Sequence, residues 1–431
     1  MVSLGCAKNA VDLQVMAGNL LKEGATLSPD PDRADTVIVN TCAFIESARE
    51  EAEAEIRRAL ELKRRGNFKK VVVTGCYPER YPKARGKFPG VDEWIGVPHE
   101  WIEPKIPALR FTGKAFAYLK IAEGCAHRCS YCAIPAIRGK YRSRPMSAIL
   151  KEAKALLASG CRELNIVAQD PMLWREEVEV GSGREVGVGS GSGTKVFKLT
   201  DLLWKLDKMK GDFWIRVLYS YPSEIDEDYV VWLMTAEHAV KYADIPLQHT
   251  VPEILEKMNR KRAIDASLTA AEVLRSLIPE ITLRTTIMTG FPGETERRFN
   301  VMRSDLRRMQ FDHLGVFAYS PEEGTKGAKM KGRPSRAVAE ARERVIMEDA
   351  EKLWKVKAKR MLGKTFRALV VAPGVARMES QAPDVDGVVR IKEKVKVKGE
   401  KVKGEKVIEV GEFVDVKLKQ LKGFDFIAEP I

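Results

Sequence analysis

Three cysteines in one short loop constrain this chain more than any other feature of its sequence. Cys125, Cys129 and Cys132 follow an apolar run at 116–122 that is typical of a strand, and their spacing is C-x3-C-x2-C. Three thiolates on one loop, here called the loop cysteines, can hold three corners of a 4Fe–4S cluster. No fourth cysteine lies nearby in the sequence, so one iron would keep an open coordination position for an outside ligand. The alternative is structural zinc, which usually takes its four ligands in pairs, and no second pair flanks this loop.

A second set of three cysteines is spread over the amino-terminal part of the chain. Cys6, Cys42 and Cys76, here called the strand-end cysteines, each come directly after a short apolar run. Helix-like segments at 10–23 and 46–65 separate the runs, and this alternation predicts a parallel sheet. Because the carboxyl ends of parallel strands meet at one edge of a sheet, the three thiols can converge there. The alternative is three unrelated buried thiols, since free cysteine is among the most buried residue types.

The rest of the chain divides into distinct parts. Strand-like and helical segments alternate through 111–334, which predicts a partial or complete (β/α) barrel with its chemistry in the loops that follow the strands. Residues 175–195 are rich in Gly and Ser and interrupt this pattern as a flexible insertion. A basic linker helix is expected at 335–361. Alternation with period two at 362–431 predicts a small antiparallel β-barrel. The whole is an α/β chain that begins with a Rossmann-like parallel-sheet domain at 1–110.

The composition constrains the cellular compartment and the partners of the protein. No apolar run approaches the roughly 18–20 residues that a membrane helix needs, and the start of the chain lacks the features of a signal peptide. We therefore expect a cytoplasmic protein that does not contact a membrane. Seven cysteines favour a reducing compartment and metal binding over disulfides, and Cys161 is expected to pack as a small hydrophobic residue. The net charge of +13 favours a polyanionic partner such as RNA or the ribosome.

With these motifs in place, the chain resembles the methylthiotransferases of the radical S-adenosylmethionine (SAM) class along nearly its whole length. The spacing of the loop cysteines, with Tyr131 before the last of them, is similar to the signature of radical SAM enzymes, in which the open iron binds SAM. The segments around the strand-end cysteines resemble the family's amino-terminal domain, whose cysteines hold a second 4Fe–4S cluster. The carboxyl-terminal strands resemble its TRAM domain, an OB-like barrel that grips the substrate.

Within the family, several segments resemble the branch that modifies an aspartate of small-subunit ribosomal protein twelve. These segments are Ile134–Arg144, Pro246–His249, Gly315–Thr325 and Asp384–Gly387. The branch that modifies tRNA adenosine typically has Gln-Ser-Gly-Ser where this chain has Gln-His-Thr-Val from Gln248. Residues 362–431 hold 14 basic and 11 acidic residues, a smaller excess than a domain that grips a tRNA backbone needs.

The resemblance implies a division of labour between the two cysteine sets. The cluster on the catalytic loop cysteines would reduce SAM to release a 5′-deoxyadenosyl radical, which takes hydrogen from the aspartate β-carbon. The cluster on the strand-end cysteines would carry a sulfur already methylated by a first SAM. Tyr131, Gln248, Gly290 and Glu294 are expected to contact SAM. Implied partners are ribosomal protein twelve, nearby ribosomal RNA and an electron donor such as flavodoxin or ferredoxin.

Two alternatives remain open at this point. The first is a tRNA adenosine 2-methylthiotransferase, which performs the same chemistry on another substrate. The second is a non-catalytic iron–sulfur protein that binds RNA through its basic helix and terminal barrel. Iron and sulfide content, together with SAM cleavage under reductant, separates the second alternative from either enzyme.

Overall fold

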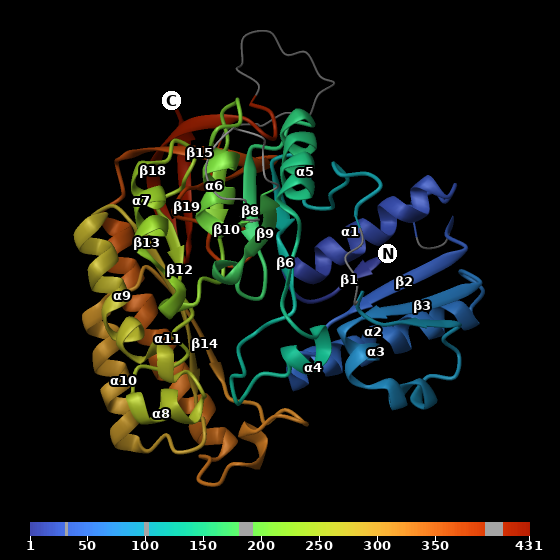
Figure 1. Cartoon of the computed structure of the whole chain (residues 1–431), viewed down its shortest axis with the longest axis horizontal. Coiled ribbons are helices and arrows are strands. Elements are labelled where there is room, and N and C mark those ends of the chain that lie inside the picture. Colours follow the sequence, from blue (N-terminus) through green and yellow to red (C-terminus); the bar gives the residue numbers. More distant parts are fainter. Residues whose placement is uncertain (31–32, 99–102, 181–192, 393–407) are drawn as a thin grey trace.

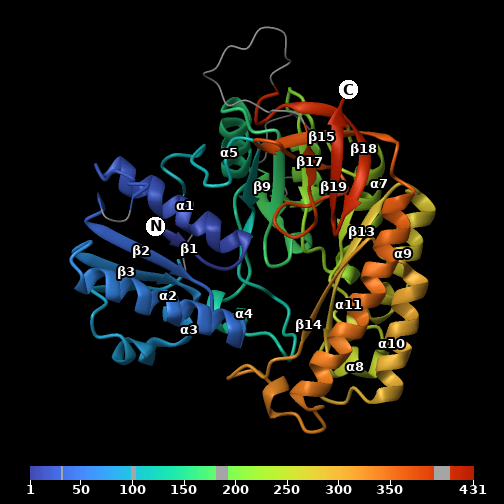
Figure 2. The same ribbon diagram turned by 180° about the vertical axis from the view of Figure 1, so that it is seen from behind.

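The structure is a computed structural model, and it describes residues 1–30, 33–98, 103–180, 193–392 and 408–431. Figure 1 shows an amino-terminal domain (blue) beside a larger α/β body. Figure 2, from behind, shows the carboxyl-terminal strands (red) and helix α11 against the back of that body. In the part of the chain that the structure describes, no helix is both long enough and apolar enough to cross a membrane.

The amino-terminal domain is a parallel sheet with helices packed on it, as the alternating pattern predicts. In the described residues the strand order is β1-β2-β3-β4, and each neighbouring pair is parallel. The valine-rich runs of β2 and β3 are buried, because a parallel strand is covered on both faces. Helix α2 buries Ala52, Ile56 and Ala59, which lie on one face. The elements are β1 (Val2–Ser3), α1 (Ala7–Lys22), β2 (Thr36–Thr41), α2 (Glu46–Arg64), β3 (Lys70–Gly75), α3 (Cys76–Arg80) and β4 (Glu93–Ile95).

The central domain is a partial barrel of parallel strands. Within the described residues the strands form two sheets, β11-β8-β5 and β12-β13-β14, and a parallel bridge from Ile215 to Ala239 joins them. No pairing of described residues closes the barrel between β5 and β14. The strands are β5 (Phe116–Lys120), β8 (Glu163–Val167), β11 (Trp214–Val217), β12 (Tyr242–Asp244), β13 (Thr282–Thr289) and β14 (His313–Ala318).

Helices cover the outer face of these strands, and their apolar sides share one core with residues such as Leu119 and Ile166. They are α5 (Met146–Ala158), α6 (Leu199–Asp207), α7 (Glu227–Thr235), α9 (Ile264–Leu277) and α10 (Glu296–Met309). Helix α8 (Pro252–Lys257) packs instead in a separate apolar cluster with Met288 and Phe291. Three short elements flank the loop cysteines: β6 (Ala122–Glu123), α4 (Ile134–Arg138) and β7 (Arg142–Ser143). The barrel interior holds a separate apolar cluster, to which α1 contributes Val11 and the carboxyl-terminal barrel contributes Leu369.

The prediction of a flexible insertion at 175–195 is wrong at both ends of that segment. Strands β9 (Arg175–Val180) and β10 (Gly193–Lys198) pair antiparallel, with Arg175 opposite Lys198 and Val178 opposite Lys195. The prediction rests on the Gly and Ser residues of this segment. The β-branched and aromatic side chains at its two ends favour strand pairing instead. The central residues, 181–192, lie outside the described part of the chain.

The basic segment expected to be a linker helix forms α11 (Arg336–Lys359), and it packs on the barrel. Its amino-terminal cap is Ser335, whose side chain accepts a hydrogen bond from the Val338 amide. Arg342 and Ile346 face inward and are buried. Asp349 accepts hydrogen bonds from Arg303 and Arg307 of α10. The helix therefore covers β13 and β14 instead of spanning open solvent (Figure 2).

The carboxyl-terminal strands close into a five-stranded barrel in the described residues, with the order β15-β16-β17-β19-β18. Four pairings are antiparallel as predicted, but β17 and β19 are parallel. Strand direction cannot alternate all the way around a closed ring with an odd number of strands, so one parallel pairing is required. The strands are β15 (Thr365–Ala372), β16 (Val375–Met378), β17 (Val389–Ile391), β18 (Phe413–Lys422) and β19 (Asp425–Pro430).

The carboxyl-terminal barrel seals one end of the central barrel. Glu163, the first residue of β8, is fully buried between Arg216 and Arg377, and Arg377 comes from β16. At the first residue of β12, the Tyr242 hydroxyl donates to Asp386 at 2.7 Å. These contacts lie at the amino-terminal ends of the barrel strands. The opposite end, where the strands finish, is therefore the end that faces the amino-terminal domain.

Candidate functional site

A tight backbone path presents the loop cysteines. Gly124 has φ +75°, and a Cβ at this position would lie 2.1 Å from the Lys140 carbonyl oxygen, so only glycine fits. The Cys125 amide donates to the Gly139 carbonyl at 3.3 Å. Within the loop, the Cys132 amide donates to the Cys129 carbonyl at 3.1 Å. These bonds fix the backbone of the loop that carries the three cysteines.

Side chains from neighbouring barrel loops surround the loop cysteines. The Arg260 guanidinium lies 3.9 Å from the Cys129 sulfur and stacks over the Tyr221 ring at 4.2 Å. His127 lies 2.6 Å from the carboxylate of Asp170, which is buried, and its ring stacks on Tyr221. The sequence marks Asp170 as part of a loop that follows a strand, but it does not predict Arg260 or His127 as neighbours of the cysteines. These partners come from loops far apart in the chain, and only Asp170 follows a recognisable strand.

The loop thiols are poor acids in this setting. Burial raises the pKa of Cys125 to about 11 and that of Cys132 to about 12. Bound metal deprotonates a thiol outright, so a buried set of this kind fits a metal cluster that brings its own positive charge. Among the described residues, no three His, Cys, Asp or Glu side chains are spaced to hold a single metal ion. A 4Fe–4S cluster spreads its thiolates over separate irons and needs no such close spacing.

The strand-end cysteines converge as the sheet topology predicts. Cys42 and Cys76 directly follow β2 and β3, and Cys6 lies just beyond β1. The backbone at Gly5 passes so close to Cys42 that a Cβ on Gly5 would lie 3.0 Å from its sulfur. The three thiols act on one another's ionisation: the Cys6 charge raises the pKa of Cys42, and both act on Cys76.

The environment shifts the pKa values of two strand-end cysteines in opposite directions. Burial raises the pKa of Cys76 to about 12. Burial acts in the same direction on Cys6, but the positive charges of Lys8 and Arg138 bring its pKa below the ordinary value. Three thiols gathered at one edge of a sheet can hold a second metal cluster, because bound metal deprotonates even a thiol whose pKa is raised.

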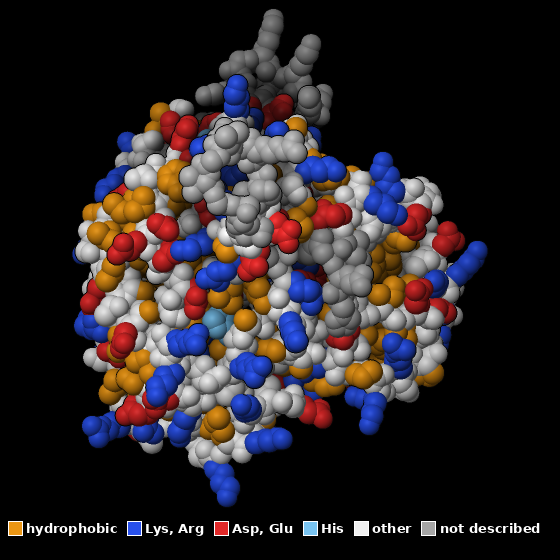
Figure 3. Space-filling model, viewed as in Figure 1, with side chains coloured by type: hydrophobic (Ala, Val, Ile, Leu, Met, Phe, Trp, Pro, Cys, Tyr) orange, Lys and Arg blue, Asp and Glu red, His pale blue; other side chains and the backbone are white. Residues whose placement is uncertain are grey.

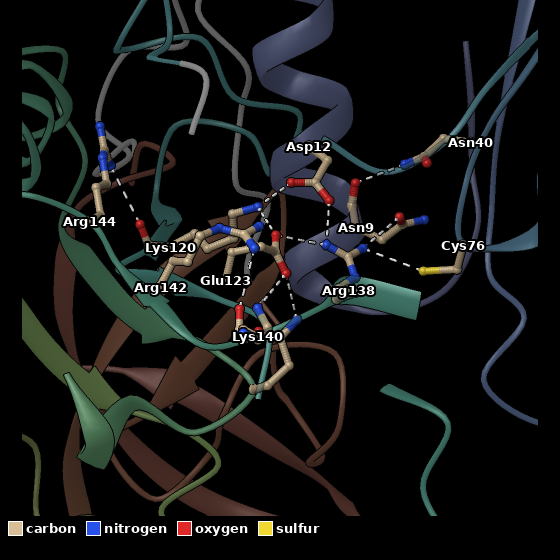
Figure 4. Close-up of polar contacts among 12 residues, drawn as sticks. Asn9, Asp12, Asn40, Cys76, Lys120, Glu123, Arg138, Lys140, Arg142 and Arg144 are labelled. Atoms are coloured by element: carbon tan, nitrogen blue, oxygen red, sulfur yellow. Dashed lines mark hydrogen bonds and ion pairs between the residues drawn. The ribbon is translucent and has the colours of Figure 1, made fainter. Parts of the chain in front are cut away.

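A buried polar network connects Cys76 of the strand-end set to Glu123, two residues before the first loop cysteine (Figure 4). Its centre is Arg138, at the end of the short helix that follows the loop cysteines. The guanidinium donates to Asp12 of α1 at 2.7 Å, to Glu123 at 3.0 Å and to the Cys76 sulfur at 3.5 Å. Lys120 donates to Glu123 at 2.7 Å and also to Asp12. The network therefore fixes the amino-terminal domain to the base of the cysteine loop.

The residues expected to contact SAM differ in whether their polar atoms already have partners within the protein. Gln248 has φ +70° and is buried, and its side-chain oxygen has no hydrogen-bond partner among the described residues. The side-chain oxygen of Gln169, which follows β8, is unpartnered in the same sense. Tyr131 is packed edge-on against Phe291. Unpaired buried oxygens are costly, so their presence at the ends of two strands fits a polar ligand bound there.

The polar groups of Gly290 and Glu294 already have hydrogen-bond partners within the protein. The Gly290 amide donates to Glu294 at 2.9 Å. The Glu294 carboxylate also pairs with Arg342 of α11 at 2.7 Å and lies 3.2 Å from His249. This carboxylate is buried and both of its oxygens are engaged, so its visible role is to hold α11 against the barrel.

Family models match the three regions in order. Residues 1–96 match the model described as "Uncharacterized protein family UPF0004", residues 119–306 match the Radical SAM superfamily, and residues 363–431 match the TRAM domain. A solved structure of the radical SAM methyltransferase TsrM from Kitasatospora setae has the same fold, with a TM-score of 0.53 and 17% identity over 74% of each chain. The partial barrel and its cysteine loop, together with these matches, define a radical SAM enzyme.

Relatives that match along the whole chain narrow this class. A protein of Moorella thermoacetica is 37% identical over 100% of this chain and 98% of its own length. One from Elusimicrobium minutum is 34% identical over 98% and 97%. Both are named ribosomal protein uS12 methylthiotransferase RimO. The chain belongs to this RimO family of radical SAM methylthiotransferases. Membership implies the use of SAM and a 4Fe–4S cluster.

Proposed function

We propose that this protein methylthiolates the β-carbon of an aspartate in ribosomal protein uS12, which is small-subunit protein twelve. SAM would serve both as methyl donor and as source of the radical. The observation that carries the proposal is the buried network in which Arg138 contacts both Cys76 of the strand-end set and Glu123, two residues before the first loop cysteine. Transfer of a methylthio group to an unactivated carbon needs a site that generates a radical and a site that supplies the sulfur. The two cysteine sets support one of these functions each.

The residues that would hold the cofactors follow from the site. The loop cysteines would bind one 4Fe–4S cluster, and the strand-end cysteines would bind a second. When bound, these groups and SAM supply the one-electron chemistry and the sulfur that protein side chains lack. The chain's own part is to hold and enclose them. Arg260 balances negative charge at Cys129, Gln248 and Gln169 offer free polar atoms, and Tyr131 with Phe291 provides an apolar wall.

A protein substrate accounts for the charges better than tRNA does. Four of the seven Lys and Arg residues of α11 form internal ion pairs, and two of these pairs, Arg342 with Glu294 and Lys357 with Asp312, join the helix to the barrel. Affinity for a nucleic-acid backbone tracks the number of phosphates that free cations neutralise. Figure 3 shows more Lys and Arg than Asp and Glu in the middle and lower part of one face, which supports auxiliary contact with ribosomal RNA. We infer further that the protein acts in the cytoplasm and receives electrons from a flavodoxin or ferredoxin.

The proposal is tested by offering both substrates in parallel. Anaerobically reconstituted protein is incubated with SAM and reductant, and with either purified uS12 or unmodified tRNA. Replacing hydrogen by a methylthio group adds about 46 Da, a covalent change that intact-mass measurement resolves. The expected result is a gain on uS12 alone. A gain on tRNA alone, with steep salt dependence of binding, would assign the chain to the tRNA-modifying alternative.

A further inference from the structure

Lys8 is a largely buried lysine whose ammonium forms no ion pair with a carboxylate of the described residues. It is the second residue of α1 and follows Cys6 by two positions. The residue is only 9% exposed, yet within the described ranges no carboxylate lies within 4 Å of its Nζ and no hydrogen bond satisfies it. Lysine is almost never buried unless it is paired. The one contact recorded for Nζ is with the face of the Tyr219 ring, 3.6 Å from the centroid.

This contact places Lys8 at the catalytic end of the central barrel. Tyr219 lies just beyond β11, at the end of the barrel that faces the amino-terminal domain. Its φ is +69°, a conformation that costs energy for a bulky side chain and is concentrated at functional sites. Lys8 therefore lies between the strand-end cysteines on its own side and the barrel loops on the other.

The nearby charges on the barrel side are already committed. Asp244 accepts a hydrogen bond from the Tyr219 amide at 2.9 Å and lies 3.7 Å from Arg284. Arg284 in turn pairs with Asp386 of the carboxyl-terminal barrel at 2.7 Å. The charges of Asp244, Arg284 and Asp386 therefore compensate one another. The ammonium of Lys8 acts electrostatically on Cys6 and Asp244 but forms no direct ion pair with a carboxylate of the described residues.

We propose that Lys8 binds the side-chain carboxylate of the acceptor residue and so selects an acidic protein side chain as the substrate. The inference rests on the proposed function. In aspartate the β-carbon is bonded directly to the carboxylate carbon. A cation two residues from Cys6 therefore grips the acceptor by the group next to the reacting carbon. A nucleobase carries no such charge and would leave the ammonium unpaired, and a site with an unpaired charged group discriminates against such a ligand.

Lys8 also has an electrostatic effect on Cys6, so the test must separate substrate recognition from cluster assembly. The variants are K8M, which removes the charge, and K8R, which keeps it. K22M is the matched control, because Lys22 is exposed at the far end of the same helix. Each protein is reconstituted anaerobically, and its iron content and substrate-free SAM cleavage are measured first. K22M is expected to match the wild type in both, and binding by the Lys8 variants is expressed per assembled cluster.

Binding is then measured with uS12 and with a uS12 variant in which the acceptor aspartate, located by mass spectrometry, is replaced by asparagine. The wild type, K8R and K22M should prefer the aspartate form by about tenfold or more, as expected for a hydrogen bond between charged groups. K8M should bind both forms equally. Its KM for uS12 should rise by a similar factor.

The outcomes distinguish the inference from the function on which it rests. If the wild type does not modify uS12, the proposed function and this inference both fall. If uS12 is modified but K8M still prefers aspartate, the inference alone is overturned. It is also overturned if K8M loses half of its iron, which would make Lys8 a cluster-assembly residue. Loss of tRNA binding in K8M, without a change for uS12, would identify a phosphate contact instead.

Discussion

The guanidinium of Arg138 lies 3.5 Å from the sulfur of Cys76, although the two residues belong to different domains. The same guanidinium pairs with Asp12 and Glu123, so one side chain contacts the sheet edge, the first helix and the barrel loop. A buried ion network therefore ties the strand-end cysteines to the base of the cysteine loop. This relationship gives the first prediction.

Replacing Arg138 with Gln should destabilise the metal-free protein. Removing one partner of a buried ion pair leaves Asp12 and Glu123 uncompensated, at a cost of roughly 3–5 kcal/mol. The thermal unfolding midpoint should fall clearly. R162Q is the control, because the Arg162 side chain forms no ion pair among the described residues. Equal midpoints for R138Q and R162Q would show that the network does not hold the domains together.

The loop cysteines should account for about half of the bound iron. We expect the triple variant with Ala at 125, 129 and 132 to keep about half of the iron of the reconstituted wild type and to lose SAM cleavage. Iron assay and chromatography of 5′-deoxyadenosine measure the two effects. Complete loss of iron, or stoichiometric zinc in its place, would contradict the presence of two independent clusters.

The strand-end cysteines should be needed for the product but not for SAM cleavage. Cys6→Ala, Cys42→Ala and Cys76→Ala are each expected to release 5′-deoxyadenosine while yielding no methylthiolated uS12. The reason is that SAM cleavage belongs to the other cysteine set. Cys161→Ala is a suitable control, since Cys161 is fully buried in the barrel core away from both sets. Normal product from any strand-end variant would reduce these thiols to a structural role.

Much of the site could be predicted because it depends on local spacing and on topology. The loop cysteines lie close together in the sequence, and the strand-end cysteines converge because parallel strands end at one edge. The assignment of each set to a cluster stays a prediction, as do the domain boundaries near residues 110 and 334. Gln248 stays a candidate SAM contact, strengthened by its unpartnered oxygen.

What could not be predicted depends on contacts between distant parts of the chain. Glu294 follows a glycine turn typical of a ligand loop, but Arg342, 48 residues later, occupies its carboxylate. Arg260 reaches Cys129 across 131 residues without any sequence motif. Lys8 is next to a predicted ligand in the sequence, yet only the fold shows that it is buried and unpaired. Such pairings are decided by packing and leave no local signal.

The pairing of α10 with α11 should appear as acid sensitivity. Hydrogen bonds from Arg303, opposed by partial burial and reinforced by Arg307, lower the pKa of Asp349 to about 2. Because the folded value is below the ordinary value of about 3.9, the stabilisation is present above pH 4 and is lost as the pH falls toward 2. D349N should therefore cost about 2 kcal/mol at pH 7 and much less near pH 2.

Thermal unfolding at several pH values checks this dependence, with E348Q as control. Glu348 is the preceding residue on the same helix and is exposed. E348Q should stay within about 0.5 kcal/mol of the wild type, as surface substitutions usually do. A cost for D349N that does not change between pH 7 and pH 2 would show that its carboxylate charge is not what holds the two helices.

The most direct test of the whole account is the intact mass of uS12 from cells with and without this protein, measured beside the nucleosides of their tRNA. The account predicts a uS12 form heavier by about 46 Da that disappears with the protein, while the tRNA nucleosides stay the same. Unchanged uS12, together with the loss of a methylthiolated adenosine from tRNA, would contradict it.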